Sequence, residues 1–179
     1  MKNKIIKHYN SASLQNMLAG KGWYENAHIE CQMIAIAFEL PLSIVVGVMA
    51  SLSPNNKWQR NIIDTWKLIN KPHLNTKVCT FKPQRKKALR ILESDGTDDT
   101  IKEILNGQKT KNFYDNILHY LDSSVVTIDM WAYRSLDLKH SKKNFELAAN
   151  AYTEASIELE LRPHQVQAVV WGVVRGDTA

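Results

Sequence analysis

The sequence predicts an all-α protein, and three observations support that prediction. Only seven of the 179 residues are glycine, and the alternation of apolar and polar positions that marks strands is scarce. Apolar residues instead recur at three- and four-residue steps, as Phe113, Ile117 and Tyr120 do, which is the spacing of one helix face. A chain of this length can bury a sizeable core without a disulfide or a structural metal, so we expect a single domain over residues 1–179.

Ten segments have helical spacing, and short polar or glycine-containing stretches separate them. The predicted helices span residues 13–18, 27–39, 41–51, 58–70, 83–93, 98–105, 110–121, 129–136, 145–158 and 162–175. A Ser-Pro-Asn-Asn stretch at 53–56 separates the third helix from the fourth, and an acidic loop that starts at Glu93 follows the fifth. Gly107 marks the turn before the seventh helix, and an apolar run at 125–128 leads into the eighth.

Composition argues against several classes of protein. Two cysteines, Cys31 and Cys79, are too few for a zinc or iron-sulfur cluster, which usually takes four ligands from Cys or His. The six histidines show no metal-ligand spacing, so we predict neither a metal ion nor another cofactor. No apolar run reaches the ~20 residues of a membrane span, and the first residues lack a signal-peptide core. We therefore expect a soluble, cytoplasmic monomer.

Positive charge is concentrated in the middle of the chain. Lys and Arg outnumber Asp and Glu by 23 to 18, which gives a formal net charge of +5 and permits nucleic-acid binding. The basic residues that precede the Gly107 turn are Lys82, Arg85, Lys86, Lys87 and Arg90. They either contact phosphate groups or form a solvated helix face, and the sequence leaves both interpretations open.

Two polar stretches are candidates for a ligand cleft. One is the loop that contains Ser53, Asn55 and Asn56, together with Trp58 and Asn61 on one face of the helix that follows. Such a loop can line a cleft. The alternative is a Ser-Pro-Asn-Asn turn that caps the next helix through its side-chain oxygens.

The other stretch is the last helix, where Gln167, Trp171 and Arg175 follow one another at four-residue steps on a valine-rich background. This polar and aromatic stripe could stack a base or hold a backbone phosphate. The alternative is a tryptophan packed at the edge of the core, with the arginine extending outward to solvent.

The most informative pair of residues is Lys111 and Asp129. Gly107 can adopt a positive φ, and the backbone amides that follow it at the start of a helix favour an anion such as a DNA phosphate. Asp129 ends the apolar run, 18 positions after Lys111. A helix of about ten residues and a tight connection fit in that gap, so we expect both side chains near one helix terminus, facing one cleft.

The segments Leu105-Asn-Gly-Gln-Lys-Thr-Lys111 and Val126-Thr-Ile-Asp129 resemble the hairpin and the catalytic segment of the helix-hairpin-helix DNA glycosylases, which include endonuclease III and the 8-oxoguanine DNA glycosylases. The resemblance implies a glycosylase-like helical domain with these parts at about residues 98–136. It places the family's Schiff-base lysine on Lys111 and its essential aspartate on Asp129. Gln108 and Lys109 replace the usual Val-Gly, and no four-cysteine loop is present, so the chain is most similar to a divergent, phage-associated branch.

The function implied by the resemblance is cleavage of the N-glycosidic bond of a damaged or modified base flipped out of duplex DNA, in a bacterial or phage-infected cell. Asp129 would stabilise the positive charge on the sugar, and Lys111 would either attack the sugar carbon as a lyase or hold a phosphate. The other residues expected at DNA are Gly107, Gln108, Lys109, Thr110 and Asn112. Those expected in the base pocket are Ser53, Asn55, Asn56, Trp58, Asn61, Trp131, Gln167, Trp171 and Arg175.

Two other functions stay open at this stage. One is an enzyme of phage DNA hypermodification that acts on a modified pyrimidine. The other is a DNA-binding module that keeps the fold without catalysis, which would bind duplexes in a salt-dependent way and release no base.

Overall fold

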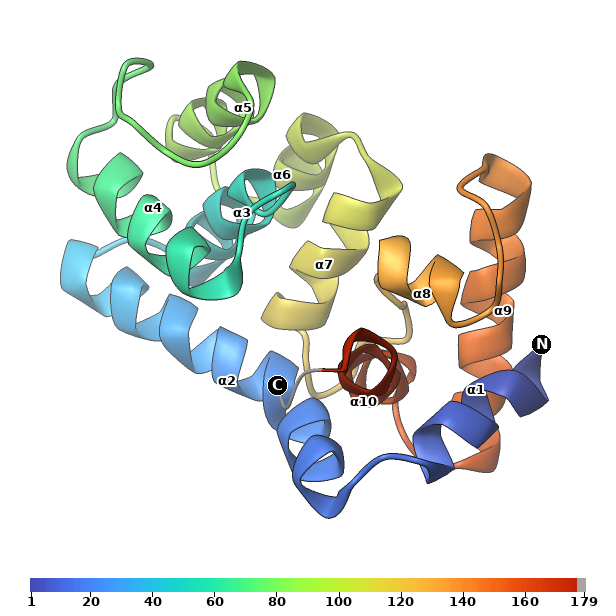
Figure 1. Ribbon diagram of the computed structural model, residues 1–179. Coiled ribbons are helices and arrows are strands. Elements are labelled where there is room, and N and C mark those ends of the chain that lie inside the picture. Colours follow the sequence, from blue (N-terminus) through green and yellow to red (C-terminus); the bar gives the residue numbers. More distant parts are fainter. Residues whose placement is uncertain (177–179) are drawn as a thin grey trace. The chain divides into compact units, whose positions relative to one another are not determined.

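A computed structural model describes residues 1–176, in which all regular secondary structure is helical (Figure 1). These residues form ten helices and no strand, which confirms the predicted all-α class. Their contacts group them into two compact units: Met1–Asn26 with the chain from His119 onward, and Ala27–Leu118. That the whole chain acts as a single domain stays a prediction.

The helices are α1 (Lys2–Asn10), α2 (Leu14–Phe38), α3 (Leu42–Leu52), α4 (Trp58–Asn70), α5 (Lys82–Leu92), α6 (Asp98–Leu105), α7 (Gln108–Leu118), α8 (Met130–Arg134), α9 (Lys142–Glu158) and α10 (Pro163–Arg175). Helices α4 and α6 have the predicted bounds, and six others differ from prediction by a few residues at one or both ends. Two predictions were wrong. Helix α1 was not predicted, and the separate helices 13–18 and 27–39 are one continuous helix, α2.

The continuity of α2 is explained by how its glycine at position 20 packs. A Cβ atom added at Gly20 would lie 2.6 Å from the Cα of Val169 on α10, so only glycine allows the two backbones to approach this closely. Glycine inside a helix costs about 1 kcal/mol relative to alanine. The packing of α2 on α10 therefore outweighs the low helix propensity of Gly20, which favours a break in the helix at this position.

The first unit is built around an apolar cluster to which α1, α8, α9 and α10 contribute (blue, orange and red in Figure 1). Its members include Ile5 and Tyr9 from α1, Tyr152 from α9 and Val169 from α10. The run that precedes α8 joins the same cluster through Val126 and Ile128, each 2% exposed. This apolar run is therefore held in place before α8 begins.

The second unit is built around α3, which packs against α4, α5, α6 and α7. Every residue of α3 from Ile44 to Leu52 is buried, as expected for a helix with no polar face at the centre of a unit. Among the described residues, no single helix is long and apolar enough to cross a membrane; only α2 and α3 taken together, with a bend of 119°, meet the criteria of length and composition.

Helices α6 and α7 form a helical hairpin joined by Asn106 and Gly107. The prediction that Gly107 supplies the positive φ was wrong, because Asn106 adopts it, with φ of 60°. Asparagine tolerates the left-handed conformation better than other residues with a Cβ, and it can end a helix in this way. The hairpin thus achieves its turn one residue earlier than expected, and α7 begins at Gln108.

We predict that Gly20→Ala lowers the free energy of unfolding by about 1–3 kcal/mol, because the methyl group forces α2 and α10 apart. Gly22→Ala is the matched control in the same helix, since the nearest atom to its added Cβ is 3.8 Å away. This control should keep or raise stability by up to about 1 kcal/mol. Urea denaturation of both variants measures the difference, and equal stability of the two would contradict the close-packing account.

Candidate functional site

Asp129 occupies the N-cap position of α8 and is half-buried. Its Oδ1 accepts hydrogen bonds from the backbone amides of Trp131, at 3.0 Å, and Ala132, at 2.8 Å. The buried run that ends at Ile128 fixes the backbone on one side of the carboxylate, and the helix fixes it on the other. The carboxylate therefore has a defined orientation, and the amide donors stabilise its negative charge.

Helix α8 rests on α9 and α10. Beneath it, the hydroxyl groups of Ser135 and Tyr152 share a hydrogen bond of 2.9 Å, and both residues are buried. Burial raises the pKa of Tyr152, the hydrogen bond to Ser135 lowers it, and the negative charge of Asp129 raises it further. Tyr152 is thus neutral at physiological pH, and Asp129 lies close enough to influence it.

In the first unit, an arginine side chain lies over the indole ring of each of two tryptophans. The guanidinium carbon of Arg134 lies 4.4 Å from the ring centre of Trp131, and that of Arg175 lies 4.6 Å from the ring centre of Trp171. Both indoles are partly buried, and both arginines are exposed. This burial agrees with the alternative interpretation of the α10 stripe, in which Trp171 packs at the core edge and Arg175 extends to solvent.

Gln167, the first member of that stripe, is 5% exposed and accepts a hydrogen bond of 3.3 Å from the Tyr24 hydroxyl. Nearby, the ring of His164 meets the ring of Tyr24 edge-on, with 5.0 Å between their centres. His164 is 1% exposed, and its Nδ1 has no hydrogen-bond partner. No spacing motif in the sequence distinguishes this histidine from the other five.

Burial lowers the pKa of His164 from its ordinary value of 6.5 to about 4, and the positive charge of Arg162 acts in the same direction. A hydrogen bond to the backbone of Ser123 opposes the shift but does not cancel it. The imidazole is therefore neutral in the folded protein at neutral pH.

In the second unit, Lys111 lies in the first turn of α7 and is partly buried. Gly107, Gln108 and Lys109 are exposed at the hairpin. Thr110 and Asn112, also predicted to contact DNA, are buried: the Thr110 hydroxyl donates to the Gly107 carbonyl and the Asn112 side chain accepts from Gln108. Lys111 and Asp129 belong to different units, and their pairing in one cleft stays a prediction.

The Ser-Pro-Asn-Asn turn forms as predicted. The Asn56 amide donates to the Ser53 carbonyl at 3.1 Å, and Asn55 adopts a positive φ of 58°, which suits a turn with proline at its second position. The alternative interpretation, in which this turn caps the next helix, does not hold at the N-cap of α4, because that residue is Lys57 and its side chain makes no capping hydrogen bond. Trp58 begins α4 and is partly buried.

Asp64 is a buried residue of this region that sequence reasoning missed. Its side chain is 0% exposed and accepts hydrogen bonds from Arg60 Nε at 3.1 Å, from Asn56 Nδ2 at 3.1 Å and from the Cys79 amide at 2.7 Å. A carboxylate in the middle of a helix ordinarily faces solvent. The sequence does offer one signal for this residue: Asp64 is the sole acidic residue between Glu39 and Glu93.

Asn61, one turn before Thr65 on α4, is also buried, at 1% exposure. Its Nδ2 donates to the Met49 carbonyl at 3.0 Å, while its Oδ1 has no partner. Asn61 therefore turns toward α3, as does Thr65, whose hydroxyl lies 3.4 Å from the Met49 sulfur. Of the pocket residues predicted in this region, Asn55 is exposed, Ser53, Asn56 and Trp58 are partly buried, and Asn61 is buried.

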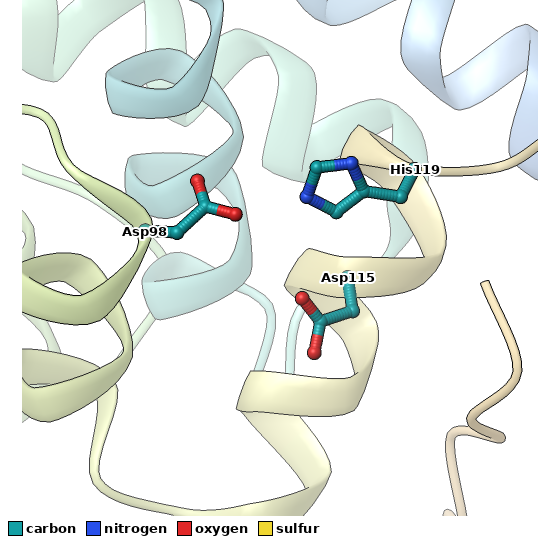
Figure 2. A group of neighbouring side chains, drawn as sticks. All are labelled: Asp98, Asp115 and His119. Carbon is teal, nitrogen blue, oxygen red and sulfur yellow. The ribbon is translucent and has the colours of Figure 1, made fainter. Parts of the chain in front are cut away.

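Figure 2 shows a group of three side chains, Asp98, Asp115 and His119, whose ligand atoms all lie within 4.8 Å of one another. Both carboxylates already have protein donors. Asp98 accepts from the Tyr114 hydroxyl at 2.8 Å, and Asp115 pairs with Lys102 at 2.6 Å. Burial, followed by the contact with Asp98, raises the pKa of Tyr114. These contacts explain the group without a metal ion, and we do not assign one to it.

Comparison with known proteins identifies one family. A family model described as "Family of unknown function (DUF7178)" matches residues 1–178. No curated protein and no solved structure matches the chain.

His164 predicts a pH dependence of stability. In the unfolded chain it binds a proton near its ordinary pKa of 6.5, whereas in the folded protein it does so only near pH 4. As the pH falls through that window the unfolded state gains the extra proton, so the free energy of unfolding decreases, by about 3 kcal/mol in all. In His164→Gln this decrease should be absent from denaturation curves, while the exposed-site control His73→Gln should keep it. An unchanged pH profile in His164→Gln would contradict the assignment.

Proposed function

The chain belongs to the family of unknown function DUF7178, and we propose that it is a DNA N-glycosylase that releases a base flipped out of the duplex. The observation that carries the proposal is the carboxylate of Asp129, held at the N-terminus of α8 by two backbone amides and by the buried run before it. A negative charge fixed in orientation before the reaction is what a developing positive charge on a sugar requires. The motif resemblance to helix-hairpin-helix glycosylases supports the same assignment.

In the proposed reaction the bond between sugar C1′ and the base nitrogen breaks, and its electron pair leaves with the base. Asp129 stabilises the positive charge that develops on the sugar. A water molecule then adds to C1′ and its proton passes through solvent to the departing base, so the products are the free base and an abasic site. One oriented charge of this kind is worth about 10² to 10³ in rate.

Lys111 has two proposed roles, which differ in product. As a cation at the start of α7 it holds a DNA phosphate, and water attacks the sugar. As a neutral amine it attacks C1′ itself, the base leaves with the electron pair and a proton, and the resulting imine permits strand cleavage by elimination of the 3′ phosphate. The support for Lys111 in both cases is the motif resemblance, which places the family's lysine at this position in the first turn of α7.

The indole rings of Trp131 and Trp171 are the proposed stacking surfaces for the flipped base. Each ring is already covered by an arginine, so a base would displace the guanidinium group, which is then available to a backbone phosphate. Stacking returns about 1–3 kcal/mol per base, against a flipping cost of a few kcal/mol. Damaged or mispaired bases, which cost least to flip, are therefore favoured.

We predict that Asp129→Asn abolishes base release while leaving the protein folded. Asparagine caps helices about as well as aspartate, so the unfolding free energy should change by less than about 0.5 kcal/mol. Asp129→Ala, which loses the cap, should cost about 1 kcal/mol in stability as well as the activity. Abasic-site formation and thermal unfolding measure the two effects separately, and an Asp129→Asn enzyme with wild-type activity would sink the assignment.

Borohydride reduction distinguishes the two roles of Lys111. If Lys111 is the nucleophile, wild-type protein gives a covalent protein-DNA adduct, Lys111→Gln gives none, and Lys109→Gln, which removes an exposed lysine of the same turn, still gives it. The absence of any adduct with wild-type protein would remove the Schiff-base step and leave hydrolysis. A trapped adduct that persists in Lys111→Gln would assign the nucleophile to another residue.

A further inference from the structure

The excess of positive over negative charge in this protein comes from one stretch of the chain. Residues 53–92 contain ten Lys and Arg but one acidic residue, Asp64, for a net charge of +9. The rest of the chain has 13 basic and 17 acidic residues, for a net charge of −4. The hairpin, residues 98–118, has three lysines and four acidic residues. The hairpin is therefore a poor electrostatic match for DNA, whereas the stretch before it is a good one.

Most of these basic side chains are available to a partner. The exposed ones, which we call the basic segment, are Lys57, Arg60, Lys67, Lys71, Lys77, Lys82, Lys86 and Arg90. On α5, Lys82, Lys86 and Arg90 follow at four-residue steps, which places them on one face. Like charges at that spacing repel one another, so the face is stabilised when an anion neutralises it.

The two helices and the connection between them are tied together by partly buried hydrogen bonds. Asp64 on α4 holds the Cys79 amide at 2.7 Å, and the Thr80 hydroxyl donates to the Pro54 carbonyl at 3.3 Å. From α5, Arg85 donates to the Leu74 carbonyl at 2.7 Å. Because α4 and α5 also both pack on α3, the basic segment is carried by one continuous part of the second unit.

We propose that the basic segment, rather than the hairpin, makes most of the phosphate contacts with duplex DNA. The inference rests on the proposed function for the identity of the polymer. A duplex presents one negative charge per about 1.7 Å of its axis, which suits a row of exposed cations on helices. The exposed positions of α5 are Lys82, Pro83, Lys86 and Arg90, a cationic face that matches a row of phosphates. Three large apolar side chains of the same stretch, Ile63, Trp66 and Phe81, are exposed outside α5, so vesicles of anionic lipid are the control ligand in the test.

The test compares two quadruple variants of the full-length protein that lose the same charge. One removes four lysines of the basic segment: Lys67→Gln, Lys71→Gln, Lys82→Gln and Lys86→Gln. The control removes four exposed lysines of the first unit: Lys7→Gln, Lys139→Gln, Lys142→Gln and Lys143→Gln. Fluorescence anisotropy with an undamaged duplex, over a series of salt concentrations, gives the affinity and its salt dependence. Circular dichroism confirms that both variants are folded.

In the basic-segment variant we expect the affinity to fall at least tenfold, and the slope of log affinity against log salt to flatten by roughly 0.9 per lost phosphate contact. The control should stay within about twofold of wild type, and Lys109→Gln should change the slope by no more than about one contact. Equal losses in both quadruple variants, or wild-type binding by the basic-segment variant, would overturn the proposal. So would binding to vesicles of anionic lipid without binding to the duplex.

The outcome is separable from that of the proposed glycosylase. If wild-type protein binds duplexes through the basic segment but releases no base, the inference stands and the glycosylase proposal fails. If wild-type protein releases base and the basic-segment variant binds DNA normally, the glycosylase proposal stands and the inference fails.

Discussion

The buried carboxylate of Asp64 holds together the segments that form the polar surface of the second unit. It accepts hydrogen bonds from Asn56, Arg60 and the Cys79 amide, and so joins the turn after α3, the helix α4 and the segment before α5. A charge removed from water is tolerated only when such donors compensate it. The same carboxylate is the one acid in a stretch of net charge +9; it pairs with Arg60, and the other basic residues of the stretch have no acidic residue among them in the sequence.

In the first unit the corresponding constraint is the apolar run that ends at Asp129. Burial of Val126 and Ile128 in the cluster of α1, α9 and α10 fixes where α8 begins, and the Asp129 carboxylate caps it. Packing of this run thus sets the orientation of the Asp129 carboxylate. That orientation connects the fold with the proposed chemistry. The two units therefore contribute different features: an oriented carboxylate in one, and a cationic surface, proposed to bind DNA, in the other.

The sequence predicted the all-α class and most helices because periodicity and turn residues are local signals. It was wrong at Gly20, where a contact with Val169 keeps α2 continuous, and at Gly107, where the neighbouring Asn106 takes the left-handed conformation. It placed Asp129 after a buried run, as the structure has it. The sequence did not predict that Asn61, Asp64 and Gln167 are buried and hydrogen-bonded. Helical spacing shows which residues share a face, but it does not show which polar side chain of that face is buried.

The central claim is that this protein breaks an N-glycosidic bond, and mass spectrometry of the small molecules released from DNA tests it most directly. Wild-type protein would be incubated with plain duplexes and with duplexes that carry damaged or modified pyrimidines, and the solution analysed for free bases and the DNA for abasic sites. We expect a free base from at least one of these substrates, with an equal amount of abasic sites or of strands cleaved at such sites. DNA that is bound, yet yields neither a free base nor an abasic site from any of them, would contradict it.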